Sequence, residues 1–70
     1  MNQTKKQKEI LKLSENLTYI DIERNKIRDK VKLMENDSEV DFSVVKDINY
    51  WIGKDLRAIK STLEYINEII

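Results

Sequence analysis

A repeating pattern of apolar residues in the first half of the chain limits the possible folds more than any other feature. From residue 10 onward, apolar side chains recur at alternating steps of three and four, with Arg24 as the one interruption: Ile10, Leu13, Leu17, Ile20, Ile27, Val31 and Met34. A heptad stripe kept up for more than three heptads is typical of a helix that packs lengthwise against another helix. The flanking positions are polar, so the stripe is narrow. We predict one helix over about residues 4–36.

The stretch from residue 35 to residue 41 is the only plausible turn. It reads E-N-D-S-E-V-D, and its short polar side chains bond to nearby backbone groups and favour turns and caps. Elsewhere proline is absent and glycine occurs once, so little else breaks a helix. We expect a turn over residues 37–41, with Asp41 capping the second helix and Val40 packing on Val45. Ser38, at capping-box spacing from Asp41, is the competing start.

The second helix, over about residues 42–69, has a wider apolar sector than the first. Its main stripe comprises Val45, Ile48, Ile52, Leu56, Ile59, Leu63, Ile66 and Ile70, and a second row comprises Val44, Trp51, Ala58 and Tyr65. A sector this wide normally packs on two neighbours, whereas a hairpin supplies one. We therefore predict an all-α fold, an antiparallel two-helix hairpin with residues 1–70 as one domain, that forms a homodimeric four-helix bundle. A different protein partner or a higher oligomer would also cover the row.

Two charged residues interrupt the predicted seam between the helices. Folding the chain about residues 38–39 places Arg24 opposite Asp55, and a lone charge in an apolar seam is costly. We predict that the two form an ion pair that fixes the register of the hairpin. The alternative is that both side chains reach solvent separately.

A cluster on the second helix is the best candidate contact patch for a partner protein. Tyr50 lies on the outer face, and Gly53 costs about 1 kcal/mol in a helix interior relative to Ala, which suggests a kink or the close approach of another backbone. Tyr, Trp and Arg dominate interface energetics, so the predicted partner-binding residues are Tyr50, Trp51, Lys54, Arg57 and Tyr65. Alternatively, Trp51 belongs to the dimer core and Tyr50 is an ordinary exposed aromatic.

The residue types needed for most catalytic chemistry are missing. The chain contains no Cys and no His, which excludes disulfides and zinc sites built from thiolates or imidazoles. The serines and threonines are scattered without a base beside them, and no glycine-rich phosphate loop exists. We expect no enzymatic activity, no cofactor, no metal and no small-molecule ligand.

The expected location and role follow from these patterns. No apolar run approaches the roughly 18 residues that a membrane span needs, and the polar start lacks the apolar core of a signal peptide, so we expect a cytoplasmic protein without membrane contact. We predict a small regulatory or adaptor protein that acts by protein-protein binding, of the kind that phages and plasmids encode to modulate a host protein. A purely structural assembly subunit is a further option.

Nucleic-acid binding is the alternative function. The first helix begins with a basic segment that comprises Lys5, Lys6, Lys8 and Lys12, and such a segment could contact phosphates. The overall net charge is zero and the isoelectric point is about 6.2, so we expect an affinity driven by phosphate contacts to be modest.

Overall fold

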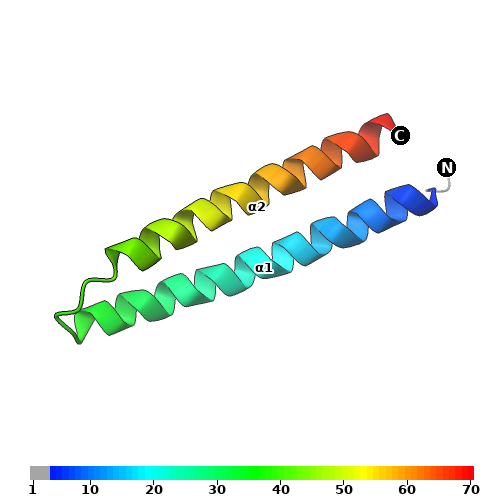
Figure 1. The fold of residues 1–70 in the computed structure, drawn as a ribbon. Helices are drawn as coiled ribbons and strands as arrows, with labels where there is room; N and C mark the ends of the chain where they lie inside the picture. Colours follow the sequence, from blue (N-terminus) through cyan, green and yellow to red (C-terminus); the bar gives the residue numbers. More distant parts are fainter. Residues whose placement is uncertain (1–3) are drawn as a thin grey trace.

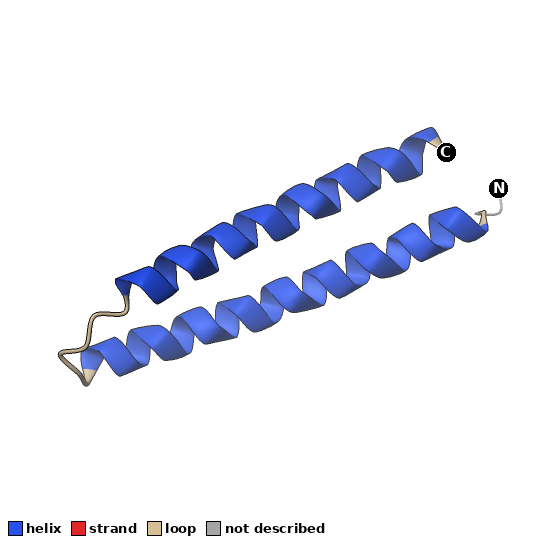
Figure 2. Ribbon diagram, viewed as in Figure 1, coloured by secondary structure: helices blue, strands red, loops and turns tan. Residues whose placement is uncertain are grey.

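The chain folds into two long antiparallel α-helices. In the computed structural model, which describes residues 4–70, helix α1 spans Lys5–Asn36 and helix α2 spans Ser43–Ile69. The helices lie side by side, with the start of α1 and the end of α2 at the same end of the hairpin (Figure 1). Between residues 4 and 70 only helix and loop occur (Figure 2), and the Cα trace measures 56 × 15 × 11 Å. The predicted all-α hairpin is confirmed.

The start of α1 is closed by a capping box. The Thr4 hydroxyl accepts a hydrogen bond from the backbone N–H of Gln7 (3.1 Å), and the Gln7 side-chain carbonyl accepts one from the backbone N–H of Thr4 (2.9 Å). These two bonds satisfy donors that the first turn of a helix leaves free. At the other end, the N–H of Asp37 donates to the carbonyl of Met34 (3.3 Å), and the chain then leaves the helix.

The turn ends where the sequence predicts, with one residue of difference. The predicted N-cap Asp41 lies one residue too early, because the N-cap of α2 is Phe42, which has no side-chain capping bond. Asp41 Oδ1 still accepts a hydrogen bond from the backbone N–H of Ser43 (2.9 Å). Helix α2 begins at Ser43 rather than at residue 42. The N–H of Ser43, then its hydroxyl and the charge of Lys46, lower the pKa of Asp41 below its ordinary value of 3.8.

The seam between α1 and α2 combines polar contacts with apolar residues that are only partly shielded. Hydrogen bonds across it run from Gln7 Nε2 to the carbonyl of Asn67 (3.4 Å) and between Arg24 and Asn49, and Lys46 forms an ion pair with Glu35 (3.1 Å). Apolar residues that face the seam are shielded only in part: Ile10, Leu17, Leu56, Leu63 and Ile66. Among residues 4–70, Val31 is the one hydrophobic residue that is buried. The hairpin thus has very little core of its own.

Candidate functional site

Four residues of each predicted stripe lie on one exposed side of the hairpin, which we call the apolar face. Its members are between 44% and 56% exposed, and they are Leu13, Ile20, Ile27 and Met34 of α1 with Val45, Ile48, Ile52 and Ile59 of α2. An apolar groove of about 260 Å³ between the helices is lined by Ile27, Val45, Ile48, Asn49 and Ile52. At this groove Ile27 of α1 and the apolar residues of α2 share one surface. Only one of the two rows of the α1 stripe, the row that contains Ile10, Leu17 and Val31, is shielded by α2.

The extent of exposed surface is large for a chain of this size. The hairpin exposes 5871 Å², whereas a compact monomer of 8.4 kDa exposes about 4,600 Å². This difference of roughly 1,300 Å² includes polar as well as apolar atoms and follows from the elongated shape of the hairpin, 56 × 15 × 11 Å. Stable homodimers bury about 2,000 Å² or more in total. The excess surface of one chain is therefore comparable to the share that one partner buries in such a homodimer.

Three of the residues predicted to bind a partner cluster on α2. The rings of Tyr50 and Trp51 meet edge to face, with centroids 5.7 Å apart. Lys54 Nζ lies 5.1 Å from the Trp51 ring centroid and 5.7 Å from that of Tyr50, within cation–π range. Tyr65 is 14 residues beyond Trp51, about 21 Å further along the helix. Tyr65 therefore belongs to a separate surface.

The predicted ion pair between Arg24 and Asp55 is wrong. Arg24 Nε instead pairs with Asp21 of its own helix at 2.9 Å, and Asp55 is exposed. The register itself was close, because Arg24 lies against Gly53, two residues from Asp55. Two residues turn a helix by about 200°, so Asp55 points away from the seam.

Gly53 provides the space in which the Arg24 side chain lies. A Cβ atom built on Gly53 would lie 2.6 Å from Nε and 2.8 Å from Nη2 of Arg24, so any side chain at this position would force the guanidinium to shift. The expected close approach thus comes from a side chain and not from another backbone. Arg24 Nη1 donates to the carbonyl of Asn49 (3.2 Å), and Asn49 Nδ2 donates to the carbonyl of Arg24 (3.3 Å). This reciprocal pair takes the place of the predicted ion pair in linking the helices at mid-length.

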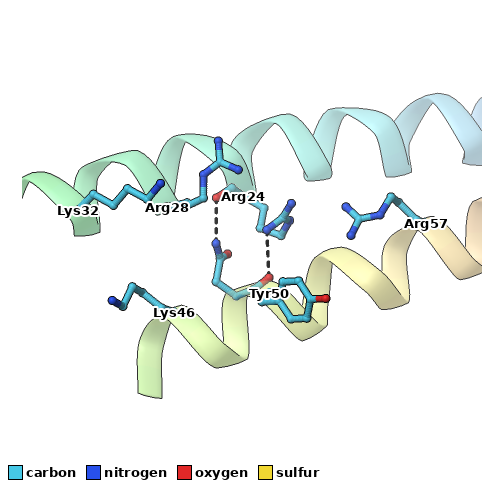
Figure 3. Close-up of a pocket in the computed structure, with 7 residues that line it drawn as sticks. Arg24, Arg28, Lys32, Lys46, Tyr50 and Arg57 are labelled. Atoms are coloured by element: carbon cyan, nitrogen blue, oxygen red, sulfur yellow. Dashed lines mark hydrogen bonds between the residues drawn. The ribbon is translucent and has the colours of Figure 1, made fainter. Parts of the chain in front are cut away.

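A second surface, which we call the basic cleft, lies between the helices on the other side. It has a volume of about 320 Å³ and is lined by Arg24, Arg28, Lys32, Lys46, Asn49, Tyr50 and Arg57. In Figure 3 the labelled side chains of both helices surround this space, and dashed lines mark the two bonds between Arg24 and Asn49. Tyr50 and Arg57 were predicted as contact residues and Arg24 as a seam residue, and Lys32 belongs to a further basic set, with Lys26 and Lys30, that the nucleic-acid alternative includes. Arg28, Lys46 and Asn49 had no predicted role at a site. One signal was available, because Arg24, Arg28 and Lys32 follow one another at one-turn intervals.

The apolar face and the basic cleft lie on opposite sides of the hairpin. Ile27 and Lys32 on α1 are five residues apart, as are Val45 and Tyr50 on α2. Five residues turn a helix by about 140°. A partner seated on the apolar face therefore leaves the basic cleft open.

The predicted nucleic-acid segment lies away from this cleft. Its lysines are exposed on the first turns of α1, at the end of the hairpin where α1 begins and α2 ends (Figure 1). The cleft lies nearer the turn, and no residue of the segment lines it.

Other classes of site find no support in the described part of the chain. Within residues 4–70, no three Asp or Glu side chains gather as they would around a metal ion. Neither α1 nor α2 has a stretch long and apolar enough to cross a bilayer. The chain matches no protein-family model, and no curated protein or solved structure is significantly similar to it.

Proposed function

We propose that this chain is a non-catalytic adaptor or regulatory module that acts by binding protein helices through its apolar face, with a second copy of the chain as the first occupant. One observation carries the proposal. In residues 4–70 a single hydrophobic residue is buried, while eight aliphatic side chains stand half-exposed on one side. Burying apolar surface is the main favourable contribution to folding and association. In the hairpin alone most of the apolar surface stays exposed, so association can still bury it.

The size of the surface supports a second copy as the occupant. If each chain covers the roughly 1,300 Å² by which it exceeds a compact monomer, a pair buries about 2,600 Å². That total is in the range of obligate homodimers. A two-fold pair uses the same surface on both chains, and two hairpins joined in this way form a four-helix bundle with a continuous core.

The distribution of charge favours an arrangement in which the hairpins pack end for end. The turn carries Asp37, Glu39 and Asp41, whereas the opposite end carries the basic segment of Lys5, Lys6, Lys8 and Lys12. End-for-end packing brings each basic end to the acidic turn of the other copy. Exposed pairs contribute under about 1 kcal/mol each and are screened by salt, so charge selects the orientation while the apolar face supplies the affinity.

Copurification of two differently tagged copies from one cell tests the proposal. We expect the wild-type copies to copurify, because each covers the apolar face of the other. Replacing Ile27 and Ile52 with Glu places charges at the centre of this face and should abolish copurification. The matched control is Leu33→Glu, an equal apolar-to-acid change at a position of α1 that is 64% exposed and outside the face. Loss of copurification in the control alone, or retention in the Ile27→Glu/Ile52→Glu variant, would contradict the proposal.

The residues predicted to bind a partner lie outside the apolar face. Trp51 and Tyr65 are 58% and 62% exposed, on the side of α2 turned away from α1. A two-fold bundle formed through the apolar face leaves this outer side of α2 free. The proposed bundle therefore differs from the one expected from the sequence, in which a second copy covers the row of Trp51 and Tyr65, and this row stays available for a further protein.

A further inference from the structure

We propose that the basic cleft binds single-stranded nucleic acid, with backbone phosphates held by Arg28, Lys32, Lys46 and Arg57 and a base stacked on Tyr50. The proposal concerns a surface different from the apolar face and from the basic segment at the start of α1. It does not depend on the bundle, because the cleft lies on the opposite side of the hairpin.

The cleft concentrates positive charge in a chain whose net charge is zero. Five of its seven lining residues are cationic and none is acidic. Three carboxylates next to the cleft form ion pairs with its cations. Asp29 pairs with Arg28 (3.3 Å), Glu35 pairs with Lys46 (3.1 Å), and Asp21 lies 3.8 Å from Arg57. Within residues 4–70, Lys32 has no carboxylate within ion-pair distance. Exposed pairs of this kind are weak, so phosphate oxygens can replace the carboxylates.

The arrangement of the cations favours a linear polyanion over a compact one. Arg28 and Lys32 are one turn apart, about 6 Å along α1, while Lys46 and Arg57 are 11 residues apart, about 16 Å along α2. A single phosphate cannot reach both ends of such a row. Arg24 forms the floor: its side chain is 10% exposed, and its three nitrogens donate within the hairpin. The four outer cations are left for the ligand.

Tyr50 distinguishes nucleic acid from other polyanions. It lines the cleft among the cations and is 55% exposed, so no core explains its position. Basic grooves that carry exposed aromatic rings bind single strands, because unpaired bases stack on the rings while the backbone follows the charge. A base within a duplex has no free face to offer.

Fluorescence anisotropy with a labelled 15-nucleotide poly-U strand tests the proposal. For single strands, affinity falls with salt with a log–log slope of about −0.7 per phosphate contact, so four contacts predict a slope near −3. The same relation gives about a fivefold loss per contact at 0.1 M salt. We therefore expect the Arg28→Gln/Lys32→Gln variant to bind about 25-fold more weakly, with the slope reduced by about 1.4.

A charge-matched variant separates the cleft from general surface electrostatics. Lys26→Gln/Lys30→Gln removes the same charge from the same helix outside the cleft and should change the affinity less than twofold. An equal loss in the two double variants would overturn the proposal. Circular dichroism checks that each variant keeps its helices; if Arg28→Gln/Lys32→Gln does not, Arg57→Gln on α2 provides the same test with an expected fivefold loss.

Two further comparisons test the assignment of the ligand. Tyr50→Ala should weaken binding about tenfold while Tyr50→Phe preserves it, because stacking needs the ring and not the hydroxyl. Inorganic polyphosphate of equal charge, and a 15-base-pair RNA duplex, should bind at least tenfold more weakly than the single strand. Equal binding of polyphosphate with no effect of Tyr50→Ala, or tighter binding of the duplex, would overturn the proposal. None of these changes touches the apolar face, so copurification of tagged copies should be unaffected.

Discussion

The contact of Arg24 with Gly53 makes an unusual prediction for the Gly53→Ala substitution. In an ordinary helix interior this change stabilises by about 1 kcal/mol, because Ala is the better helix former. Here the added methyl group would lie 2.6 Å from Nε of Arg24. We predict that Gly53→Ala destabilises the wild-type hairpin but stabilises a hairpin that already carries Arg24→Ala.

The magnitude follows from the bonds that Arg24 makes. To escape the new methyl group, the guanidinium must leave the carbonyl of Asn49, to which Nη1 donates at 3.2 Å. A hydrogen bond from a charged group contributes about 1.5–3 kcal/mol. Ala also stabilises the helix by about 1 kcal/mol relative to Gly. The free energy of unfolding should therefore fall by about 0.5–2 kcal/mol in Gly53→Ala. In the Arg24→Ala background only the gain remains.

Thermal and urea unfolding of the four variants, followed by circular dichroism, measures this double-mutant cycle. All samples need the same protein concentration, because any association adds to the apparent stability. We expect an interaction energy of about 1.5–3 kcal/mol between the two sites, visible as several degrees in Tm. Additive effects, or stabilisation by Gly53→Ala in both backgrounds, would show that Arg24 does not lie against Gly53 in solution.

Three smaller predictions concern single positions. Ser14 is 7% exposed and its hydroxyl has no hydrogen-bond partner; since such a group costs about 1–3 kcal/mol, Ser14→Ala should raise the free energy of unfolding by about 1 kcal/mol in urea titrations, and a loss would contradict this. Glu35→Gln removes the partner of Lys46 and should lower stability by less than about 1 kcal/mol, with the difference vanishing at high salt. Folding lowers the pKa of Asp41 below 3.8, so the stabilising effect of its bond to Ser43 is present in full above the unfolded value, near pH 4, and is lost as the pH falls through the lowered value. An NMR titration of the Asp41 carboxyl group and the Ser43 amide should show both at one midpoint, and a midpoint above 3.8 would refute the assignment.

Apolar periodicity was enough to predict the helices and the turn. The stripe from Ile10 to Met34 and the wide sector of α2 require long helices, and the polar stretch near Asp41 is the only place to end them. The register was also close, because the length of the turn determines which residues of the two helices lie opposite each other. The helix bounds, the position of the turn and the register depend on local sequence, so they can be predicted from the sequence of a single chain.

The rotation of each helix about its axis could not be predicted. Arg24 was expected to meet Asp55, yet it lies on Gly53, since a wide apolar sector does not specify which part of α2 faces α1. The basic cleft could not be predicted for the same reason, because it depends on the rotation of α2 about its axis. Arg28 and Lys32 form a visible row with Arg24, but only the observed rotation of α2 brings Lys46 and Arg57 beside them.

Sedimentation equilibrium at low micromolar concentration, with circular dichroism on the same samples, tests whether a second copy covers the apolar face. We expect the wild-type chain to sediment at twice its mass of 8.4 kDa and to be strongly helical. The Ile27→Glu/Ile52→Glu variant should sediment as a single chain and lose helix content, because a hairpin with one buried hydrophobic residue has little else to stabilise it. A wild-type chain that stays at 8.4 kDa and fully helical would contradict this account.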